Sequence, residues 1–118
     1  MQRIKLPWPP SLSKCFTNVK GRGRVPTKEY KAWTEHALWE IASQKPRRFA
    51  GEVSVWIGLV APDKRRMDAD NRLKATLDVL VKSGIIEDDS NRVLRRISVE
   101  WLASGDPCTI LIQAVEGA

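Results

Sequence analysis

The sequence predicts an α+β fold in which a small mixed sheet is covered by helices. Three observations support this prediction: two segments carry apolar residues at helical spacing, four short segments alternate apolar and polar residues, and turn-forming residues separate them. The predicted order is β-α-β-α-β-β, and a mixed sheet with helices packed against it buries the apolar faces of such a set. With 118 residues, 42% of them hydrophobic, and no internal repeat or linker, we expect a single domain over residues 1–118.

Four strands are predicted from alternation. The first covers residues 3–6 and ends at a pair of prolines, which remove donors from the ladder. Residues 52–60 give the clearest strand, because Val, Val, Ile and Leu stand at every second position. Residues 93–101 alternate in the same way, and a Ser-Gly-Asp-Pro turn leads into the last strand, residues 108–115. We expect this last strand to run antiparallel to its predecessor.

Residues 27–43 are predicted to form the first helix. Thr27 is the expected N-cap, and an acidic residue in the first turn suits the helix dipole. The helix has an apolar face made by Tyr30, Trp33, Ala37 and Ile41. Trp39 lies off that face and is either a second core contact or an exposed aromatic at a subunit interface, with neither favoured. The single histidine, His36, is expected to be structural.

A second helix is predicted over residues 71–83. Its apolar stripe consists of Leu73, Leu77, Leu80 and Val81. Gly84 is the expected stop, because glycine readily adopts the left-handed conformation that ends many helices. The apolar pair Ile85-Ile86 then anchors a loop that presents Asp88-Asp89.

The chain is basic, with a net charge of +6 and a pI near 9.7, which favours a polyanionic partner. Residues 1–50 carry eleven Lys and Arg against three Glu, whereas residues 51–118 carry nine against eleven acids. Residues 11–26 show no regular period and are expected to be a flexible basic loop that either wraps around phosphates or is an ordinary connection. The candidate phosphate contacts are Lys20, Arg22, Arg24, Arg47, Arg48, Lys64, Arg65 and Arg66.

Several classes of protein are excluded. Cys15 and Cys108 are far apart and only one histidine is present, so neither a Cys/His zinc site nor a disulfide framework is expected. No apolar run reaches the length of a membrane span, and residues 1–20 lack the apolar core of a signal peptide. Two free thiols suit a reducing compartment, so we expect a cytoplasmic protein without membrane contact.

The stretch around residues 65–74 places carboxylates and a lysine together in this basic chain. Asp68 and Asp70 point to the same side if the backbone there is extended, and Lys74 lies one helical turn after Asp70. Asp70 could alternatively cap the helix, with Asp70–Lys74 and Lys74–Asp78 as exposed ion pairs worth about 0.3–0.5 kcal/mol each. Clustered acids in a protein that binds polyanions favour a metal site over helix capping. A cation bound among the carboxylates removes their repulsion of the polyanion.

Oxygen ligands without Cys or His nearby are those that Mg²⁺ or Mn²⁺ selects. A carboxylate cluster with such an ion can activate water and stabilise the leaving oxygen of a phosphodiester. Lys74 would neutralise charge that develops on the phosphate. The residues therefore indicate Mg²⁺-dependent phosphodiester hydrolysis.

The combined pattern is more specific than a pair of aspartates. It comprises Asp68-x-Asp70-Asn71-x-x-Lys74-x-x-x-Asp78, a leucine-rich helix, Gly84 and Asp88-Asp89. This pattern resembles the RusA family of crossover (Holliday) junction endodeoxyribonucleases of bacteria and their phages. The chain length and an early Pro9-Pro10-Ser11 extend the resemblance over nearly the whole chain. The family often has Asn shortly after this Pro-Pro-Ser, whereas Ser13 stands here, which bears on the contacts of the N-terminal loop.

The resemblance implies that Asp68, Asp70 and Asp89 hold Mg²⁺, with Mn²⁺ as a substitute and Asp88 as a further candidate ligand. It implies that Lys74 is the essential lysine, and that Asn71 and Asp78 support the loop and helix. It also implies a homodimer, whose two-fold symmetry matches a four-way junction and allows symmetric paired nicks.

The leading hypothesis is thus a Mg²⁺-dependent endonuclease that resolves four-way DNA junctions in recombination and repair. The main alternative is a non-catalytic DNA-binding protein of phage or prophage origin, which explains the basic residues and leaves the carboxylates idle. A phosphotransferase acting on small molecules ranks last, because no phosphate-cradling glycine loop precedes a helix.

Overall fold

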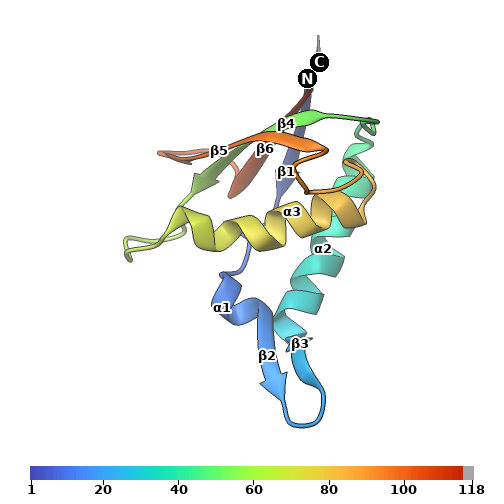
Figure 1. The fold of residues 1–118 in the computed structure, drawn as a ribbon. Coiled ribbons are helices and arrows are strands. Elements are labelled where there is room, and N and C mark those ends of the chain that lie inside the picture. Colours follow the sequence, from blue (N-terminus) through green and yellow to red (C-terminus); the bar gives the residue numbers. More distant parts are fainter. Residues whose placement is uncertain (116–118) are drawn as a thin grey trace.

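The computed structural model describes residues 1–115 and contains a four-stranded sheet with helices packed on one face (Figure 1). A separate two-stranded hairpin stands at the far end of the helices. The elements, in chain order, are β1 (Gln2–Leu6), α1 (Leu12–Cys15), β2 (Phe16–Val19), β3 (Gly23–Pro26), α2 (Lys28–Gln44), β4 (Val53–Val60), the 3₁₀ helix η1 (Ala69–Arg72), α3 (Leu73–Lys82), β5 (Leu94–Leu102) and β6 (Cys108–Ala114). The six predicted elements are all present, and the α+β prediction is confirmed.

The strands of the main sheet lie in the order β1-β6-β4-β5. β4 and β5 are parallel and joined through α3, whereas β6 is antiparallel to both β4 and β1. The last strand therefore runs opposite to its predecessor, as predicted, but the two are not neighbours because β4 lies between them. β6 buries Cys108, Ile110 and Ile112 and suits the interior of the sheet, whereas β5 is mostly exposed and suits an edge.

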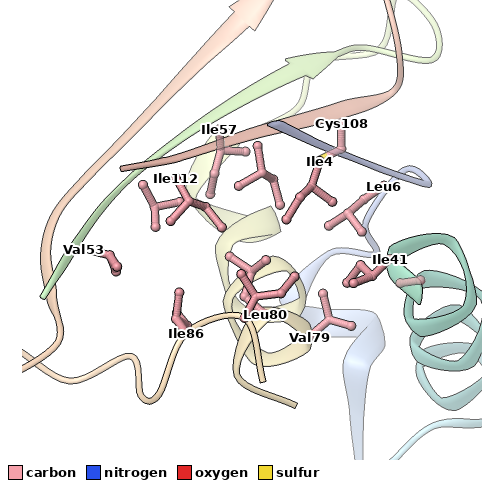
Figure 2. Packing of buried hydrophobic residues seen from close by; sticks show 14 of the residues in the cluster. Ile4, Leu6, Ile41, Val53, Ile57, Val79, Leu80, Ile86, Cys108 and Ile112 are labelled. Carbon is pink, nitrogen blue, oxygen red and sulfur yellow. The ribbon is translucent and has the colours of Figure 1, made fainter. Parts of the chain in front are cut away.

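The core lies between the helix-facing side of the sheet and helices α2 and α3 (Figure 2). The alternation predicted for residues 52–60 is confirmed: Val53, Val55, Ile57 and Leu59 are all buried. Val79 and Leu80 of α3 pack below the sheet, and Ile41 comes from α2. These contacts fix α3 along the sheet and so determine where its two ends present their side chains.

α2 begins as predicted, since the Thr27 side chain accepts a hydrogen bond of 3.1 Å from the Tyr30 backbone N–H. The predicted apolar face is also confirmed, because Tyr30, Ala37 and Ile41 are buried and Trp33 is partly buried. Trp39 is 68% exposed and points away from this face. Of the two interpretations of Trp39, the core contact is therefore wrong for the single chain.

The prediction of a loop over residues 11–26 is wrong. This segment forms α1 and the hairpin of β2 and β3, in which Phe16 pairs with Pro26 and Val19 with Gly23. The hairpin strands are mostly exposed, so they lack the apolar alternation that marks a half-buried strand. A small cluster of Cys15, Tyr30 and Phe16 joins the base of the hairpin to α2. The tip, with Gly21 at φ +79° and Gly23 at φ +73°, points away from the sheet.

The second predicted helix is present, but its first turn is tighter than expected. Residues 69–72 form η1, and the α-helix proper is Leu73–Lys82. Gly84, at φ +82°, follows the helix as predicted. The Arg48 guanidinium packs directly over Gly84, where a Cβ atom would clash with its Nη1. A cation at this position also suits the negative end of the helix dipole.

Candidate functional site

Asp68 and Asp70 stand at the entrance to η1. Asp68 has an extended backbone (φ −101°, ψ 129°) and its side chain makes no capping hydrogen bond, while Asp70 lies in the first turn. Both are exposed, and neither carboxylate has a hydrogen bond or an ion pair within residues 1–115. The capping interpretation of Asp70 therefore finds no support, and two carboxylates that are two residues apart keep their oxygens available for a ligand.

Lys74 follows these carboxylates by one helical turn and is paired within α3. Its Nζ lies 3.2 Å from Asp78 Oδ1, so the expected pair with Asp78 forms and the pair with Asp70 does not. The hydroxyl of Tyr30 donates to the other oxygen of Asp78 at 2.9 Å. Asp78 thus joins α2 to the ammonium group of Lys74, which agrees with its expected supporting role. Sequence reasoning placed Tyr30 in the core and missed this contact.

The hydroxyl of Tyr30 is held in its neutral form. Burial, followed by the hydrogen bond to Asp78, raises the pKa of Tyr30 above its ordinary value of 10.0. Because the pKa of Tyr30 is higher in the folded than in the unfolded chain, the neutral, hydrogen-bonded Tyr30 stabilises the fold fully below about pH 10. This stabilisation is lost as the pH rises further.

Titration of Tyr30 tests this arrangement. Because Tyr30 is the one tyrosine in the chain, absorbance of tyrosinate reports this group alone. We expect no tyrosinate in the folded protein at pH 10, where an unfolded chain is half ionised, and we expect D78N to lower the midpoint. A folded protein that titrates at the ordinary value would contradict the bond to Asp78. Far-UV circular dichroism at each pH distinguishes titration from unfolding.

Asp88 and Asp89 lie in the loop between α3 and β5. Ile85 and Ile86 are 2% and 1% exposed and anchor the start of this loop, as predicted. The Ser90 hydroxyl and backbone N–H groups, first among them that of Asp89, hold the pKa of Asp88 below its usual range. Asp88 and Asp89 are both exposed.

The carboxylates predicted to act together lie at opposite ends of α3. Asp68 and Asp70 precede the helix and Asp89 follows it, and a helix of ten residues spans about 15 Å. Figure 1 shows the segment before α3 and the loop after it on different sides of the molecule. Within residues 1–115, no three His, Cys, Asp or Glu side chains are arranged to hold a metal ion. A single chain therefore brings Asp68 and Asp70 together and leaves Asp89 apart.

A hollow of about 560 Å³ lies at the segment that carries Asp68 and Asp70: Met67 and Arg72, which flank this segment, line the hollow, whereas the two aspartates do not. The indoles of Trp8 and Trp33 contribute to its walls, as does the side chain of Met67. Its charged lining consists of the cations Lys14, Arg65, Arg66 and Arg72 and the carboxylates Glu29 and Asp63, of which Asp63 is paired with Arg65. Positive charge, aromatic surface and two available carboxylates thus occur next to one another, which suits a nucleic-acid backbone that passes the carboxylates.

Arg72 connects this hollow to the N-terminal segment. Its guanidinium lies 4.9 Å from the centre of the Trp8 ring, and its Nη1 donates to the Pro9 carbonyl at 3.0 Å. Burial lowers the pKa of Arg72 from its usual value, and the buried Nε has no hydrogen-bond partner within the part of the chain described. Nothing in the sequence pointed to Arg72, although the adjacent Pro9-Pro10-Ser11 pattern was a signal for this segment.

The predicted phosphate contacts fall into three groups. Lys20, Arg22 and Arg24 belong to the hairpin. Arg47 and Arg48 follow α2, near the loop that carries Asp89, because the Phe49 N–H donates to the Ile85 carbonyl at 2.8 Å. Lys64, Arg65 and Arg66 lie in the loop that leads to Asp68. All eight are exposed.

Some of these cations also have partners within the chain. The guanidinium of Arg24 lies over the Phe16 ring, and that of Arg47 lies over the Phe49 ring. Arg65 forms a salt bridge of 2.9 Å with Asp63.

No helix within residues 1–115 has the length and apolar character needed to cross a bilayer.

Comparison with known proteins identifies the family. Residues 7–113 match the family model described as Endodeoxyribonuclease RusA. The chain is 36% identical to the crossover junction endodeoxyribonuclease RusA of Aquifex aeolicus over 87 residues, which cover 73% of this chain and 68% of the relative. It is 35% identical to the enzyme of that name from Enterobacteria phage 82, and 34% identical to that of Escherichia coli K12, with coverage of 80% and 78% in each case. The chain therefore belongs to the endodeoxyribonuclease RusA family.

Proposed function

We propose that this protein is an endonuclease that resolves four-way DNA junctions by symmetric paired nicks in recombination and repair. The observation that carries the proposal is the position of two unpaired carboxylates, Asp68 and Asp70, between Met67 and Arg72, which line a hollow together with the cations Lys14, Arg65 and Arg66. The relatives in the same family are named crossover junction endodeoxyribonucleases. The family pattern extends across the carboxylates, Lys74 and Asp89, which supports these residues as the catalytic set.

Membership of a nuclease family suggests a requirement for a divalent metal ion. The donors are carboxylates alone, and such hard oxygen ligands favour Mg²⁺, with Mn²⁺ as a substitute. Asp68, Asp70 and Asp89 are the proposed ligands, with Asp88 as a further candidate. When bound, the ion supplies positive charge for the phosphate oxygens and lowers the pKa of water. Lys74 places a further positive charge one turn into α3.

The exposed cations would bind the DNA backbone, and selectivity for junctions would come from their shape. The hairpin tip extends beyond the helices, so Lys20, Arg22 and Arg24 can reach a DNA arm that leaves the site. Arg65 and Arg66 line the hollow next to Asp68 and would hold the strand that is cut.

A matched pair of variants tests the contribution of the hairpin. Each phosphate contact contributes about 0.9 to the slope of log affinity against log salt concentration. We expect K20Q to reduce this slope by roughly that amount. K5Q makes the same chemical change on the outer face of β1, away from the helices, and should leave the slope unchanged. Fluorescence anisotropy with a labelled junction measures the slope for each variant. Equal slopes for the two variants would show that Lys20 of the hairpin does not contact the DNA backbone.

The same proposal includes a homodimer as the acting species and the bacterial cytoplasm as its location. A four-way junction has two-fold symmetry, so two equivalent sites can cut strands of the same polarity. The relatives come from bacteria and from a phage, and junction DNA in such cells lies in the cytoplasm.

The deciding experiment compares a four-way junction with a linear duplex of the same sequence, each with Mg²⁺ and with EDTA. We expect paired nicks in the junction with Mg²⁺ alone, and little cutting of the duplex. Denaturing gels of the separately labelled strands identify the nicks. Tight junction binding without any nick under all conditions would instead support a non-catalytic DNA-binding protein.

A further inference from the structure

Arg72 is a charged side chain that is partly withdrawn from water without a carboxylate partner. It is half-buried, and it forms no salt bridge within residues 1–115. Its Nε is buried and has no hydrogen-bond partner in the same part of the chain. Taking a charge out of water without a counter-charge lowers the stability of a fold, and so does burying an unpaired donor. Stability alone therefore does not account for an arginine at this position.

The guanidinium is nevertheless held in one place. Its Nη1 donates to the Pro9 carbonyl at 3.0 Å, and its Cζ lies 4.9 Å from the centre of the Trp8 ring. Pro9 is buried and its ring fixes the backbone angle φ, so the accepting carbonyl belongs to a stiff segment. The centre of the Trp8 ring in turn lies 6.1 Å from that of Trp101 at the end of β5. These contacts position the guanidinium before any ligand arrives.

One guanidinium nitrogen is left for a ligand. Nη1 is bound to Pro9 and Nε is buried, whereas Nη2 makes no hydrogen bond within residues 1–115 and is not buried. Arg72 lines the hollow of about 560 Å³ together with Met67, the residue before Asp68. Nη2 is therefore a donor that a molecule in this hollow can reach.

The charges around the hollow favour an anion as that ligand. Burial, followed by the charge of Arg65 in the same hollow, lowers the pKa of Arg72. Cations that face one space repel each other, and an anion between them removes the repulsion. The carboxylates of the lining do not take this role, because Asp63 is paired with Arg65 and Glu29 forms no salt bridge within residues 1–115.

A phosphodiester is the anion that suits this position best. A guanidinium binds phosphate oxygens through strong, directed hydrogen bonds, and arginine is the usual residue where such geometry matters. The four residues of η1 include both Asp70 and Arg72, so a strand that Arg72 binds passes close to the carboxylates.

We propose that Arg72 is a phosphate-binding residue of the site formed by Asp68 and Asp70, and that its Nη2 donates to a backbone oxygen of the DNA strand in the hollow. The inference rests on the proposed function for the statement that this strand is the one cut. Lys14 and Arg66 are exposed and have to be ordered when DNA binds, whereas Arg72 is already in place. Binding to Arg72 therefore costs less side-chain entropy and fixes the position of the strand.

Methionine at position 72 separates binding from stability. R72M removes the charge and keeps an unbranched, adaptable side chain beside Trp8. We expect no fall in melting temperature, because the unpaired charge and the buried Nε are removed together with the one hydrogen bond to Pro9. Junction binding in EDTA should be roughly 10- to 100-fold weaker, the loss expected for one hydrogen bond to a charged group. Unchanged junction affinity, whatever the melting temperature, would overturn the proposal.

The salt dependence of binding distinguishes loss of charge from loss of geometry. R72K keeps the charge but lacks the planar fork of donors that bonds Pro9 and a phosphate at once. We expect R72M to lower the slope of log affinity against log salt concentration by about 0.9, and R72K to preserve the slope at an intermediate affinity. R3M is the matched control, because Arg3 lies on the outer face of β1, away from the helices. Equal slopes for R72M and R3M would contradict a phosphate contact of Arg72.

Neutral linkages in the DNA identify the phosphate. A methylphosphonate carries no charge, so one placed at each position in turn around the point of strand exchange removes one phosphate contact at a time. We expect one linkage whose replacement weakens binding by the unmodified protein in EDTA and has little further effect on R72M. R72Q repeats the scan with a side chain that can still donate to the Pro9 carbonyl, which covers the case of an unstable R72M. The absence of any coupled linkage in both variants would refute the contact.

The same DNA tests the proposed function separately. Nicks in the unmodified junction with Mg²⁺ report cutting, whereas coupling between Arg72 and a linkage in EDTA reports binding alone. Where nicks occur, we expect the coupled linkage beside the nicked one, and a coupled linkage in another arm would place Arg72 outside the cutting site. Coupling without any nick would reject the proposed function and leave the phosphate contact, whereas paired nicks without coupling would reject only the role of Arg72.

Discussion

Replacing Asp70 by asparagine is expected to abolish paired nicking of a four-way junction, with a fall in rate of roughly 10³-fold or more. Asparagine keeps the size of the side chain and removes the negative charge that a divalent ion requires. Asp70 is exposed and has no side-chain partner within residues 1–115, so the fold should be unaffected. Junction affinity in EDTA should be equal or slightly higher, because a negative charge near the DNA has been removed.

The control is D106N, the same chemical change in the turn between β5 and β6, where Asp106 faces Arg3 at 3.8 Å. It should leave the rate of nicking unchanged. Initial rates on a labelled junction, a binding titration in EDTA and a thermal melt separate the possible outcomes. If D70N lost binding without losing stability, Asp70 would be a DNA contact and not part of the reaction centre.

Replacing Lys74 by methionine should lower the rate of nicking by roughly 10²–10³-fold, the usual loss when one preorganised charge at a phosphate is removed. Methionine preserves much of the apolar stem of lysine, so packing along α3 should change little. The side chain is 46% exposed and lies 3.2 Å from Asp78, so the ion pair itself contributes little to stability. We expect a fall in kcat with little change in junction affinity.

The matched control is K82M, which removes a charge from the other end of the same helix and should leave kcat unchanged. A second comparison uses Y30F, which frees Asp78 from the Tyr30 hydroxyl while leaving Lys74 in place. If Tyr30 positions Lys74 through Asp78, Y30F should show a partial loss of kcat. A full-rate K74M enzyme would exclude Lys74 from the reaction.

The elements that bury one face were predictable because burial imposes a period on the sequence. Val53, Val55, Ile57 and Leu59 mark β4 in this way, and so does the face of α2 that contains Ala37. The hairpin of residues 16–26 was not predictable, because it buries almost nothing of its own and depends on Cys15 and Tyr30 for contact with the rest of the chain. Local periodicity carries no information about such a segment.

The candidate site was predictable only in its local part. The spacing of Asp68 and Asp70 and the position of Lys74 along the helix follow from residues close in sequence. The separation of Asp89 from them depends on the course of α3 across the sheet, and the bond between Tyr30 and Asp78 joins residues 48 apart. The roles of Asp68, Asp70, Lys74 and Asp89 remain predictions until variants are measured.

The place of β6 between β1 and β4 has a consequence for the order of events during synthesis. Within the described residues β1 pairs only with β6, so residues 2–6 can join the sheet only once residues 108–112 are present. Until β6 leaves the ribosome, β4 also lacks the neighbour that covers one of its edges. Contacts this distant in sequence close slowly. The main sheet therefore cannot be completed before β6 has been synthesised.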